Sequence, residues 1–314
     1  MSEKYAAEFQ SIIERARSQE KPMRVAVAGA DCENILKGLF EAEAEGWVKP
    51  ILIGNYEKIR TTLDAIGCKD RKYDIQPVAD SDSPVQYAIE MINAHKADVL
   101  MRGNTQTRDF LMPILNKANH LIRKDARVTH VVMLKIPGYD RLLGVSDVTL
   151  LIAPTADERR EVARNLVKVL HAFGVPKPNI ALLAMVEKPS FHMRDTVEDQ
   201  TMVKRHLQQP IEECNLAGPI AYDLIISKEA ARLKNFDCPY CGEFDGVVVP
   251  NLMSGNLLVK VLEYNAGAIG CGVLAGARIP VALTSRSDKP EKSYLSLAAC
   301  GAMIVDGDVE EYER

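Results

Sequence analysis

Short apolar runs alternate with segments of helical periodicity along almost the whole chain of 314 residues. The first run, Met23–Ala28 (MRVAVA), leads at once into Gly29, Ala30 and Asp31, and residues 32–45 then show helical spacing of their apolar side chains. Asp31 is expected to be the N-cap of that helix. A strand, a helix and another strand in this order require right-handed crossovers, so the alternation predicts an α/β fold with mostly parallel sheets.

The other expected elements continue this order. We expect strands over residues 50–53, 73–78, 97–101, 128–136, 146–152, 179–186 and 244–249, two strand-like runs within 269–283 joined through Gly272, Gly276 and Arg278, and helices over 56–66, 84–94, 108–119, 157–173, 195–207, 254–264 and 290–301. The length suits two domains rather than one core. Because the charged run 122–127 separates a helix from a new strand, the first domain is predicted to hold residues 1–127 plus 276–314 and the second 128–275.

Composition argues against two classes of partner. The net charge is −4 and the pI about 5.9, so no broad basic surface is expected to bind nucleic acid. Apolar runs break at charges well short of the ~20 residues that span a bilayer, so no membrane partner is expected. The first twenty residues lack the apolar segment of a signal peptide. Seven scattered cysteines are typical of reduced thiols, and the predicted location is the cytoplasm.

Polar residues follow several of the expected strands. In open parallel sheets, ligands bind beyond the carboxyl ends of the strands. The residues that this rule selects are Arg102, Gly103, Asn104, Thr105, Glu187, Lys188, Asn251 and residues 284–288. The rule therefore predicts that these segments deliver side chains into a cleft.

The sequence TSRSD, residues 284–288, combines three hydroxyls, an arginine and a carboxylate directly before an expected helix. Such a group suits a tetrahedral oxyanion, because an arginine grips phosphate with paired charge-assisted bonds and a helix N-terminus adds a positive dipole. The alternative is an ordinary helix cap beside a surface arginine. The residues alone leave both interpretations open.

Two further segments combine a strand end with a helix start. In MRGNTQTRDF (101–110), Gly103 would let the backbone approach a ligand, while Thr105 or Thr107 could hold phosphate or simply cap the next helix. In VVVPNLMSGNLLVK (247–260), Ser254 could cap a helix, and Gly255 and Asn256 could line the cleft. A strand-to-helix turn would explain the proline and serine but not Asn256.

The residues give little indication of a metal or redox centre. Cys238 and Cys241 form a CxxC pair, but no second pair or HxxxH motif supplies further zinc ligands. Asp195, Glu198 and Asp199 could hold a divalent cation, although acids in a first helical turn usually complement the helix dipole on a solvated face. We therefore expect no metal and interpret the two cysteines as reduced thiols in a loop.

Three stretches together resemble the phosphate acetyltransferase/phosphate butyryltransferase family. They are KIPGYDRLLGVSDVTLLIAP (135–154), VVVPNLMSGNLLVKVLEYNAGAIGCGVLAGARIPVALTSRSD (247–288) and LMRG (100–103), and the likeness runs from about residue 23 to 302. The PGYDRLL segment is more similar to the butyryl branch than to the acetyl branch. This resemblance implies two α/β domains like those of isocitrate and isopropylmalate dehydrogenases, with the active site in the interdomain cleft of a homodimer.

The reaction that the resemblance implies is reversible: acyl-CoA and phosphate give acyl phosphate and CoA, with CoA as a substrate and no metal or redox cofactor. By the motif, Ser285 matches the catalytic serine and Arg286 the phosphate-binding arginine. Asp288 lies near the position of the catalytic acid, but the acetyl branch has its aspartate several residues later, where this chain has Lys292. The remaining expected substrate-binding residues are Arg102, Gly103, Thr105, Thr107, Gly255, Asn256 and Thr284.

Two other functions stay open at the level of sequence. One is a metal-dependent dehydrogenase or decarboxylase on the same fold, which would need convergent carboxylates and a nucleotide-binding loop. The other is a non-catalytic domain that binds CoA or acyl phosphate, against which the intact Thr-Ser-Arg triplet argues. The acyl chain length, the general base and any role of the two cysteines are also left open.

Overall fold

The computed structural model describes residues 5–122, 126–211 and 213–306. These residues group into two compact units. Unit 1 contains residues 5–8 and 129–270, and unit 2 contains residues 9–128 and 271–306. Part of the charged run 122–127 lies outside the described residues. Among the helices that are described, none is both long and apolar enough to cross a bilayer.

Unit 2 is built on strands in the order β3-β2-β1-β4-β11-β10. Their bounds are β1 Met23–Ala28, β2 Val48–Gly54, β3 Asp74–Pro77, β4 Val99–Arg102, β10 Ile269–Ala275 and β11 Val281–Ala282, with β10 carrying the chain over from unit 1. All neighbouring pairs are parallel except β10 and β11, which are antiparallel. The predicted α/β fold with a mostly parallel sheet is confirmed.

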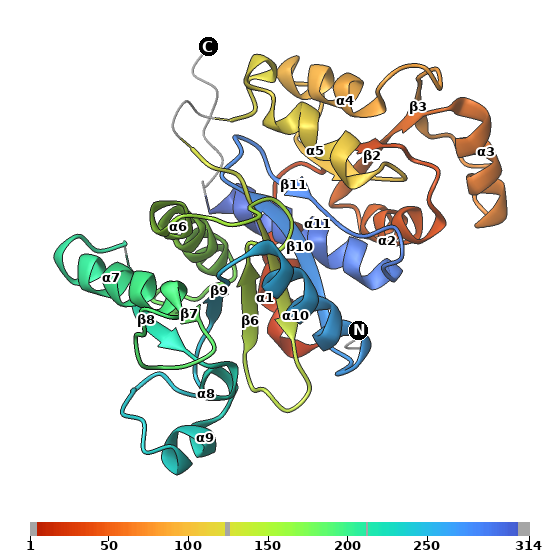
Figure 1. Cartoon of the computed structure of the whole chain (residues 1–314). Helices are drawn as coiled ribbons and strands as arrows, with labels where there is room; N and C mark the ends of the chain where they lie inside the picture. Colours follow the sequence, from red (N-terminus) through yellow and green to blue (C-terminus); the bar gives the residue numbers. More distant parts are fainter. Residues whose placement is uncertain (1–4, 123–125, 212, 307–314) are drawn as a thin grey trace. The chain divides into compact units, whose positions relative to one another are not determined.

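The helices of unit 2 include α11 (Figure 1), and the residues of this helix are buried along most of its length. Their bounds are α1 Gln10–Arg17, α2 Glu33–Ala44, α3 Tyr56–Ala65, α4 Pro84–Asn93, α5 Thr107–Leu115 and α11 Pro290–Val305, with a short 3-10 helix at Lys117–Asn119. Another 3-10 helix, Ala7–Phe9, begins in unit 1 and ends at the first residue of unit 2. The α11 sequence is small or apolar nearly all round, which is the pattern of a helix inside a core. A Cβ atom on Gly301 would lie only 2.7 Å from Cβ of Ala16, so α1 packs tightly against α11.

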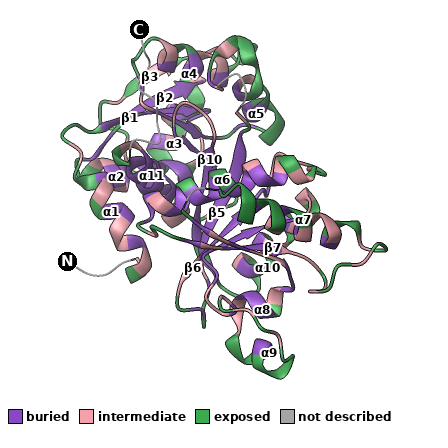
Figure 2. Cartoon of the chain, turned by 90° about the vertical axis from the view of Figure 1, so that its left-hand side faces the viewer, coloured by how far each residue is buried: buried purple, intermediate pink, exposed green. Residues whose placement is uncertain are grey.

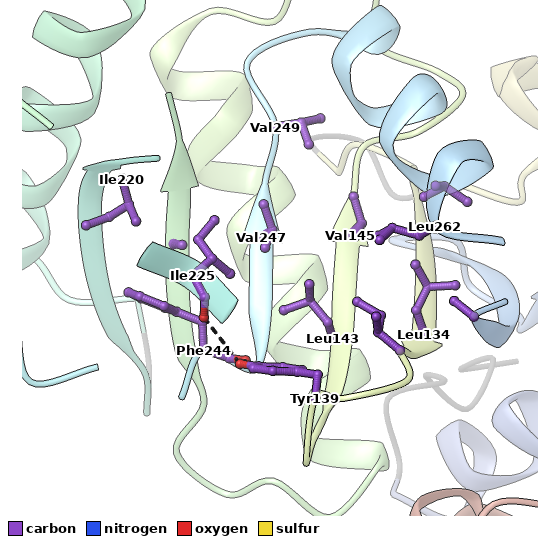
Figure 3. Close-up of a cluster of buried hydrophobic side chains, with 14 of the residues drawn as sticks. Leu134, Tyr139, Leu143, Val145, Ile220, Ile225, Phe244, Val247, Val249 and Leu262 are labelled. Carbon is purple, nitrogen blue, oxygen red and sulfur yellow. Dashed lines mark hydrogen bonds between the residues drawn. The ribbon is translucent and has the colours of Figure 1, made fainter. Parts of the chain in front are cut away.

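Unit 1 has strands in the order β5-β6-β9-β7-β8. The bounds are β5 Thr129–Lys135, β6 Leu142–Ser146, β7 Asn179–Leu183, β8 Asn215–Ile220 and β9 Gly246–Val248, with helices α6 Ala156–Ala172, α7 Arg194–Gln208, α8 Tyr222–Ile226, α9 Lys228–Leu233 and α10 Leu252–Tyr264. The strands are largely buried, whereas α9 carries mostly exposed residues (Figure 2). Figure 3 shows a cluster of buried side chains in this unit, in which the Tyr139 hydroxyl donates to the Phe244 carbonyl at 2.6 Å.

Some predictions for unit 1 were wrong. The strand expected over residues 146–152 is instead β6, which ends at Ser146 and forms an antiparallel hairpin with β5. Residues after Ser146 turn, because the Asp147 carboxylate accepts the backbone N–H groups of Thr149 and Leu150 at 2.7 and 3.1 Å. Strand β8 was not predicted because Gly218 and Pro219 interrupt it; β8 ends the strand order, where a proline is tolerated.

The N-caps of α2 and α10 also differ from the predictions. Cys32, not Asp31, occupies the N-cap of α2, and its side chain makes no capping bond. Asn251, not Ser254, caps α10 by accepting the Ser254 backbone N–H at 2.9 Å. Helix α10 therefore begins two residues earlier than predicted. Gly272 lies inside β10 rather than in a connection between two strands.

Candidate active site

The carboxyl ends of β1, β4 and β11 lie side by side in unit 2. Strand β1 pairs in parallel with β4, where Ala28 faces Arg102, and β4 pairs in parallel with β11, where Met101 faces Ala282. The segments that follow these strands therefore leave the sheet at the same edge. Segments 102–107 and 284–288, which the sequence selects independently, are brought together there.

Gly103 allows the ends of β1 and β4 to come into close contact. Its N–H donates to the Ala28 carbonyl at 2.9 Å, and the Asn104 N–H donates to the Gly29 carbonyl at 2.6 Å. A Cβ atom on Gly103 would overlap the Gly29 carbonyl oxygen and lie 2.6 Å from its carbonyl carbon. The Asn104 amide donates to Asp31 at 3.1 Å, so the Asp31 side chain, which does not cap α2, binds a residue at the end of β4.

Arg102 joins the two segments of the site. Its side chain is only 7% exposed, its Nε and Nη2 donate to the Thr105 carbonyl at 3.1 and 2.6 Å, and its Nη1 donates to the Thr284 carbonyl at 3.2 Å. Burial, followed by repulsion from Arg286, lowers the pKa of Arg102, while Asp288 acts in the opposite direction. The guanidinium nevertheless remains protonated in a protein. Two positive charges thus act on one another at this edge, which favours an anionic ligand.

Residues 285–288 form a closed turn before α11. The Ser285 N–H donates to Oδ2 of Asp288 at 2.7 Å, and the Asp288 N–H donates back to the Ser285 carbonyl at 3.0 Å. The Ser285 and Ser287 hydroxyls are 3.0 Å apart, and the Arg286 side chain is exposed. Helix α11 begins at Pro290 and has Lys289 at its N-cap without a side-chain bond. The alternative in which a hydroxyl of TSRSD caps this helix is therefore wrong.

The predicted threonines are placed differently from one another. Thr105 and Thr284 are 9% and 3% exposed, and their Oγ1 atoms are buried without a hydrogen-bond partner. Thr107 is exposed and is the first residue of α5, whose N-cap is Gln106. Neither Thr105 nor Thr107 caps this helix, so the capping alternative for segment 101–110 is wrong as well.

Helix α2 and its N-cap contribute two residues that the sequence interpretation missed. The Cys32 sulfur lies 4.0 Å from the Arg286 carbonyl oxygen, and the Asn34 amide donates to the Asp288 carbonyl at 3.1 Å. Both follow β1, and the strand-end rule applied to β1 would have selected this region. The site is therefore built by three segments, which follow β1, β4 and β11.

Residues 74–300 match the model of the phosphate acetyl/butaryl transferase family. The chain belongs to this family. It is 32% identical to the phosphate butyryltransferase of Clostridium acetobutylicum over 300 residues, which cover 96% of this chain and 98% of the relative. It is also 30% identical to the phosphate acetyltransferase of Rhizobium meliloti over 292 residues, 93% of this chain and 92% of the relative.

This chain is similar to a solved structure over most of its length. The branched-chain phosphotransacylase from Enterococcus faecalis V583 superposes with a TM-score of 0.76 at 27% identity, covering 90% of this chain and 99% of that chain. The family resemblance inferred from the sequence motifs is confirmed, and the protein is an acyltransferase. Family membership disfavours both the metal-dependent dehydrogenase and the non-catalytic binding domain.

Gly255 and Asn256, from the second motif typical of the family, lie in unit 1 on α10. A Cβ atom on Gly255 would lie 2.6 Å from the Asp147 carbonyl oxygen. The Asn256 amide donates to the Val148 carbonyl at 3.3 Å, although the residue itself is exposed. Both residues therefore pack α10 against the turn that follows β6, and this packing explains the asparagine that the sequence left unexplained.

The acidic cluster of α7 is not a solvated face throughout. Asp199 is fully buried and forms an ion pair with Arg159, which also contacts Glu198 at 3.1 Å. Burial raises the pKa of Asp199 to about 6, against the opposing effect of Arg159. The solvated-face interpretation is wrong for Asp199, because this residue is buried. A buried charge requires a partner, and Arg159 supplies it. Within the described parts of the chain, no group of three or more His, Cys, Asp or Glu residues is arranged to hold a metal ion.

Cys238 and Cys241 are both free thiols. Cys241 is buried, and burial, with Cys238 acting in the same direction, raises the pKa of its thiol to about 12. The thiolate is the reactive form of cysteine, so Cys241 is not a nucleophile at neutral pH. This agrees with the interpretation of the pair as reduced thiols.

Proposed function

We propose that the protein transfers a short acyl group reversibly between CoA and inorganic phosphate, and that the edge of unit 2 formed by the ends of β1, β4 and β11 binds the phosphate. The observation that carries the assignment is the convergence of Arg102, Arg286 and Ser285 at this edge. Family membership supports the reaction, and the two neighbouring guanidinium groups support the position of the anion.

Arg286 supplies the accessible positive charge for the phosphate. Arg102 is largely occupied with two backbone carbonyls, so its main contribution is to hold the segments together and to add positive potential. The hydroxyls of Thr105 and Thr284, both without a partner, are donors that a phosphate oxygen or a water could satisfy. Thr107 completes the proposed phosphate side, and Gly103 contributes by letting the ends of β1 and β4 come into close contact, since its own N–H is bonded to the Ala28 carbonyl.

Ser285 is the proposed donor to the oxyanion. In the direction of acyl-phosphate formation, a phosphate oxygen attacks the thioester carbonyl carbon, the carbonyl oxygen becomes negative, and the C–S bond then breaks to release CoA thiolate. A fixed hydroxyl donor stabilises the tetrahedral state more than the substrate. In the reverse direction Asp288 accepts the proton of the CoA thiol, and that proton returns to the thiolate in the forward direction.

We expect kcat/KM for butyryl-CoA to exceed that for acetyl-CoA. The PGYDRLL segment favours the butyryl branch, and each additional buried methylene is worth about 1–3 kcal/mol at a transition state. The measurement is release of free CoA thiol in phosphate buffer with each substrate at several concentrations. Equal or reversed values would assign the protein to the acetyl branch or to a generalist one, and absence of thiol release with both would contradict the proposed function.

Several finer features are proposed as well. The resemblance implies a fold like that of isocitrate and isopropylmalate dehydrogenases with the active site in the interdomain cleft, and a part for Gly255 and Asn256 in substrate binding. The division into domains 1–127 plus 276–314 and 128–275 rests on the charged run 122–127, and the cytoplasmic location rests on the scattered cysteines. No metal or redox cofactor is proposed, because the acyl transfer written above needs neither.

A homodimer is proposed through the exposed face of α10. Met253, Leu257, Val261 and Tyr264 are 77%, 57%, 44% and 65% exposed and follow one another at helical spacing. A continuous exposed apolar stripe of this kind is typical of an interaction surface. We expect a dimer mass by light scattering after size exclusion, and a shift to monomer in Leu257→Glu.

The matched control for the dimer is Leu233→Glu on α9, because Leu233 is 72% exposed but lies outside the stripe. This variant should remain dimeric. A monomeric wild type, or equal dissociation of both variants, would contradict the assignment of the interface to α10.

A further inference from the structure

Lys292 is placed where its charge needs a partner. It lies in the first turn of α11, and the positive end of a helix dipole disfavours a cation there. Its Nζ is 3.2 Å from Oδ2 of Asp288, and the two side chains are only 14% and 8% exposed. The same carboxylate oxygen accepts the Ser285 N–H at 2.7 Å. One oxygen atom therefore links α11 to the backbone of the proposed catalytic serine.

The start of α11 is held rigidly by α2. A Cβ atom on Gly38 would lie 2.8 Å from Cβ of Ser293 and 3.0 Å from the backbone nitrogen of Tyr294, so the two helices are in close contact. The Asn34 amide also donates to the Asp288 carbonyl at 3.1 Å. Helix α2 therefore contacts both the first turn of α11, which carries Lys292, and the turn 285–288.

We propose that Lys292 is a positioning residue for acyl transfer, which acts on Ser285 through Asp288. This inference rests on the proposed function. The ammonium fixes the Asp288 carboxylate, and the carboxylate fixes the Ser285 backbone from which the hydroxyl and the neighbouring Arg286 extend. A displacement of about 1 Å in such a group can cost on the order of 10²-fold in rate. Low exposure preserves the interaction, because screening by water is what weakens surface pairs.

The chain offers a matched control for this ion pair. Lys37 and Glu33 have the same i,i+4 spacing in α2 and a distance of 3.1 Å, but their side chains are 46% and 52% exposed. Such surface pairs contribute little. Lys37→Met removes the same charge from the same unit without touching the turn.

The experiment compares steady-state kinetics and melting temperatures of the wild type with Lys292→Met, Lys292→Arg, Asp288→Asn, the double variant Asp288→Asn with Lys292→Met, and Lys37→Met. We expect Lys292→Met to lower kcat roughly tenfold, with a smaller change in KM for phosphate. Lys292→Arg should recover most of the loss because it keeps the charge. Asp288→Asn should lower kcat more than Lys292→Met does, because it also removes the proposed proton acceptor. In that background Lys292→Met should cause no further loss of kcat, since the ion pair is already removed. Lys37→Met should behave as the wild type.

Three results would overturn the positioning role: wild-type kcat in Lys292→Met, a full additional loss in the double variant, or no recovery in Lys292→Arg. A wild type without acyl transfer would instead contradict the proposed function. The positioning role is then decided by calorimetric titration of the same variants with inorganic phosphate. Weaker binding in Lys292→Met that is non-additive with Asp288→Asn supports it, and unchanged or additive values overturn it.

Discussion

Replacing Ser285 with alanine should lower kcat by roughly 10²–10³ with little change in KM. The hydroxyl matters mainly when negative charge develops on the carbonyl oxygen, so its loss affects the transition state more than substrate binding. The measurement is thiol release from butyryl-CoA at varied phosphate. Ser287→Ala is the matched comparison, because Ser287 lies in the same turn and is exposed; it should lose less activity.

Arg286→Ala should change the kinetics in a different way from Ser285→Ala. This variant removes a charge-assisted contact present in both ground and transition states, so KM for phosphate should rise, and Arg286→Lys should restore only part of it. Since neither side chain caps α11, both alanine variants should keep the melting temperature of the wild type. Full activity in Ser285→Ala and Arg286→Ala would show that the turn 285–288 is not the catalytic site.

Gly103→Ala should damage stability and activity together. The added methyl would overlap the Gly29 carbonyl and lie 2.8 Å from the Ala28 carbonyl oxygen, and these are backbone atoms that cannot rotate away. Forced overpacking of this kind costs about 1–3 kcal/mol, occasionally more. Because the ends of β1 and β4 must separate, Arg102 and Thr105 would also move, and kcat/KM should fall steeply. Thermal melting and kinetics on the same preparation test both effects.

The comparison for this variant is Gly46→Ala. A Cβ atom on Gly46 would meet no heavy atom within 4 Å, but its φ of +87° makes a side chain unfavourable. This variant should lose about 1 kcal/mol of stability and keep normal kinetics. Wild-type stability and kinetics in Gly103→Ala would contradict the tight contact between the two strand ends.

Helices and strands in the first half of the chain could be predicted because their sequence patterns depend only on neighbouring residues. Met23–Ala28 was predicted with its observed bounds, and the helix that follows was predicted to within a residue at each end. A continuous apolar run followed by helical spacing needs no knowledge of distant residues. The strand-end rule also selected Arg102 and residues 284–288, although it could not show that β11 would lie next to β4.

Two of the errors concern residues that have partners far away in the sequence. Asp31 has the chemistry of an N-cap, but Asn104, far away in the sequence, binds its carboxylate instead. Asp199 was expected in water, but Arg159 of α6 holds it in the interior. Lys292, by contrast, lies only four residues after Asp288, so this ion pair is a local contact, although Asp288 lies in the turn before α11 and not on the helix.

The insertion of β11 between β4 and β10 has a consequence for biosynthesis. Strand β11 and helix α11 are made after the rest of unit 2, so a nascent chain that ends before residue 281 presents β4 as an open sheet edge. Open edges invite pairing with other chains. The same incomplete chain also lacks Ser285 and Arg286. Synthesis of the last part of the chain therefore both covers the edge of β4 and adds the proposed anion-binding turn. A ribosome that stalls before residue 281 would carry an inactive intermediate that is prone to aggregate.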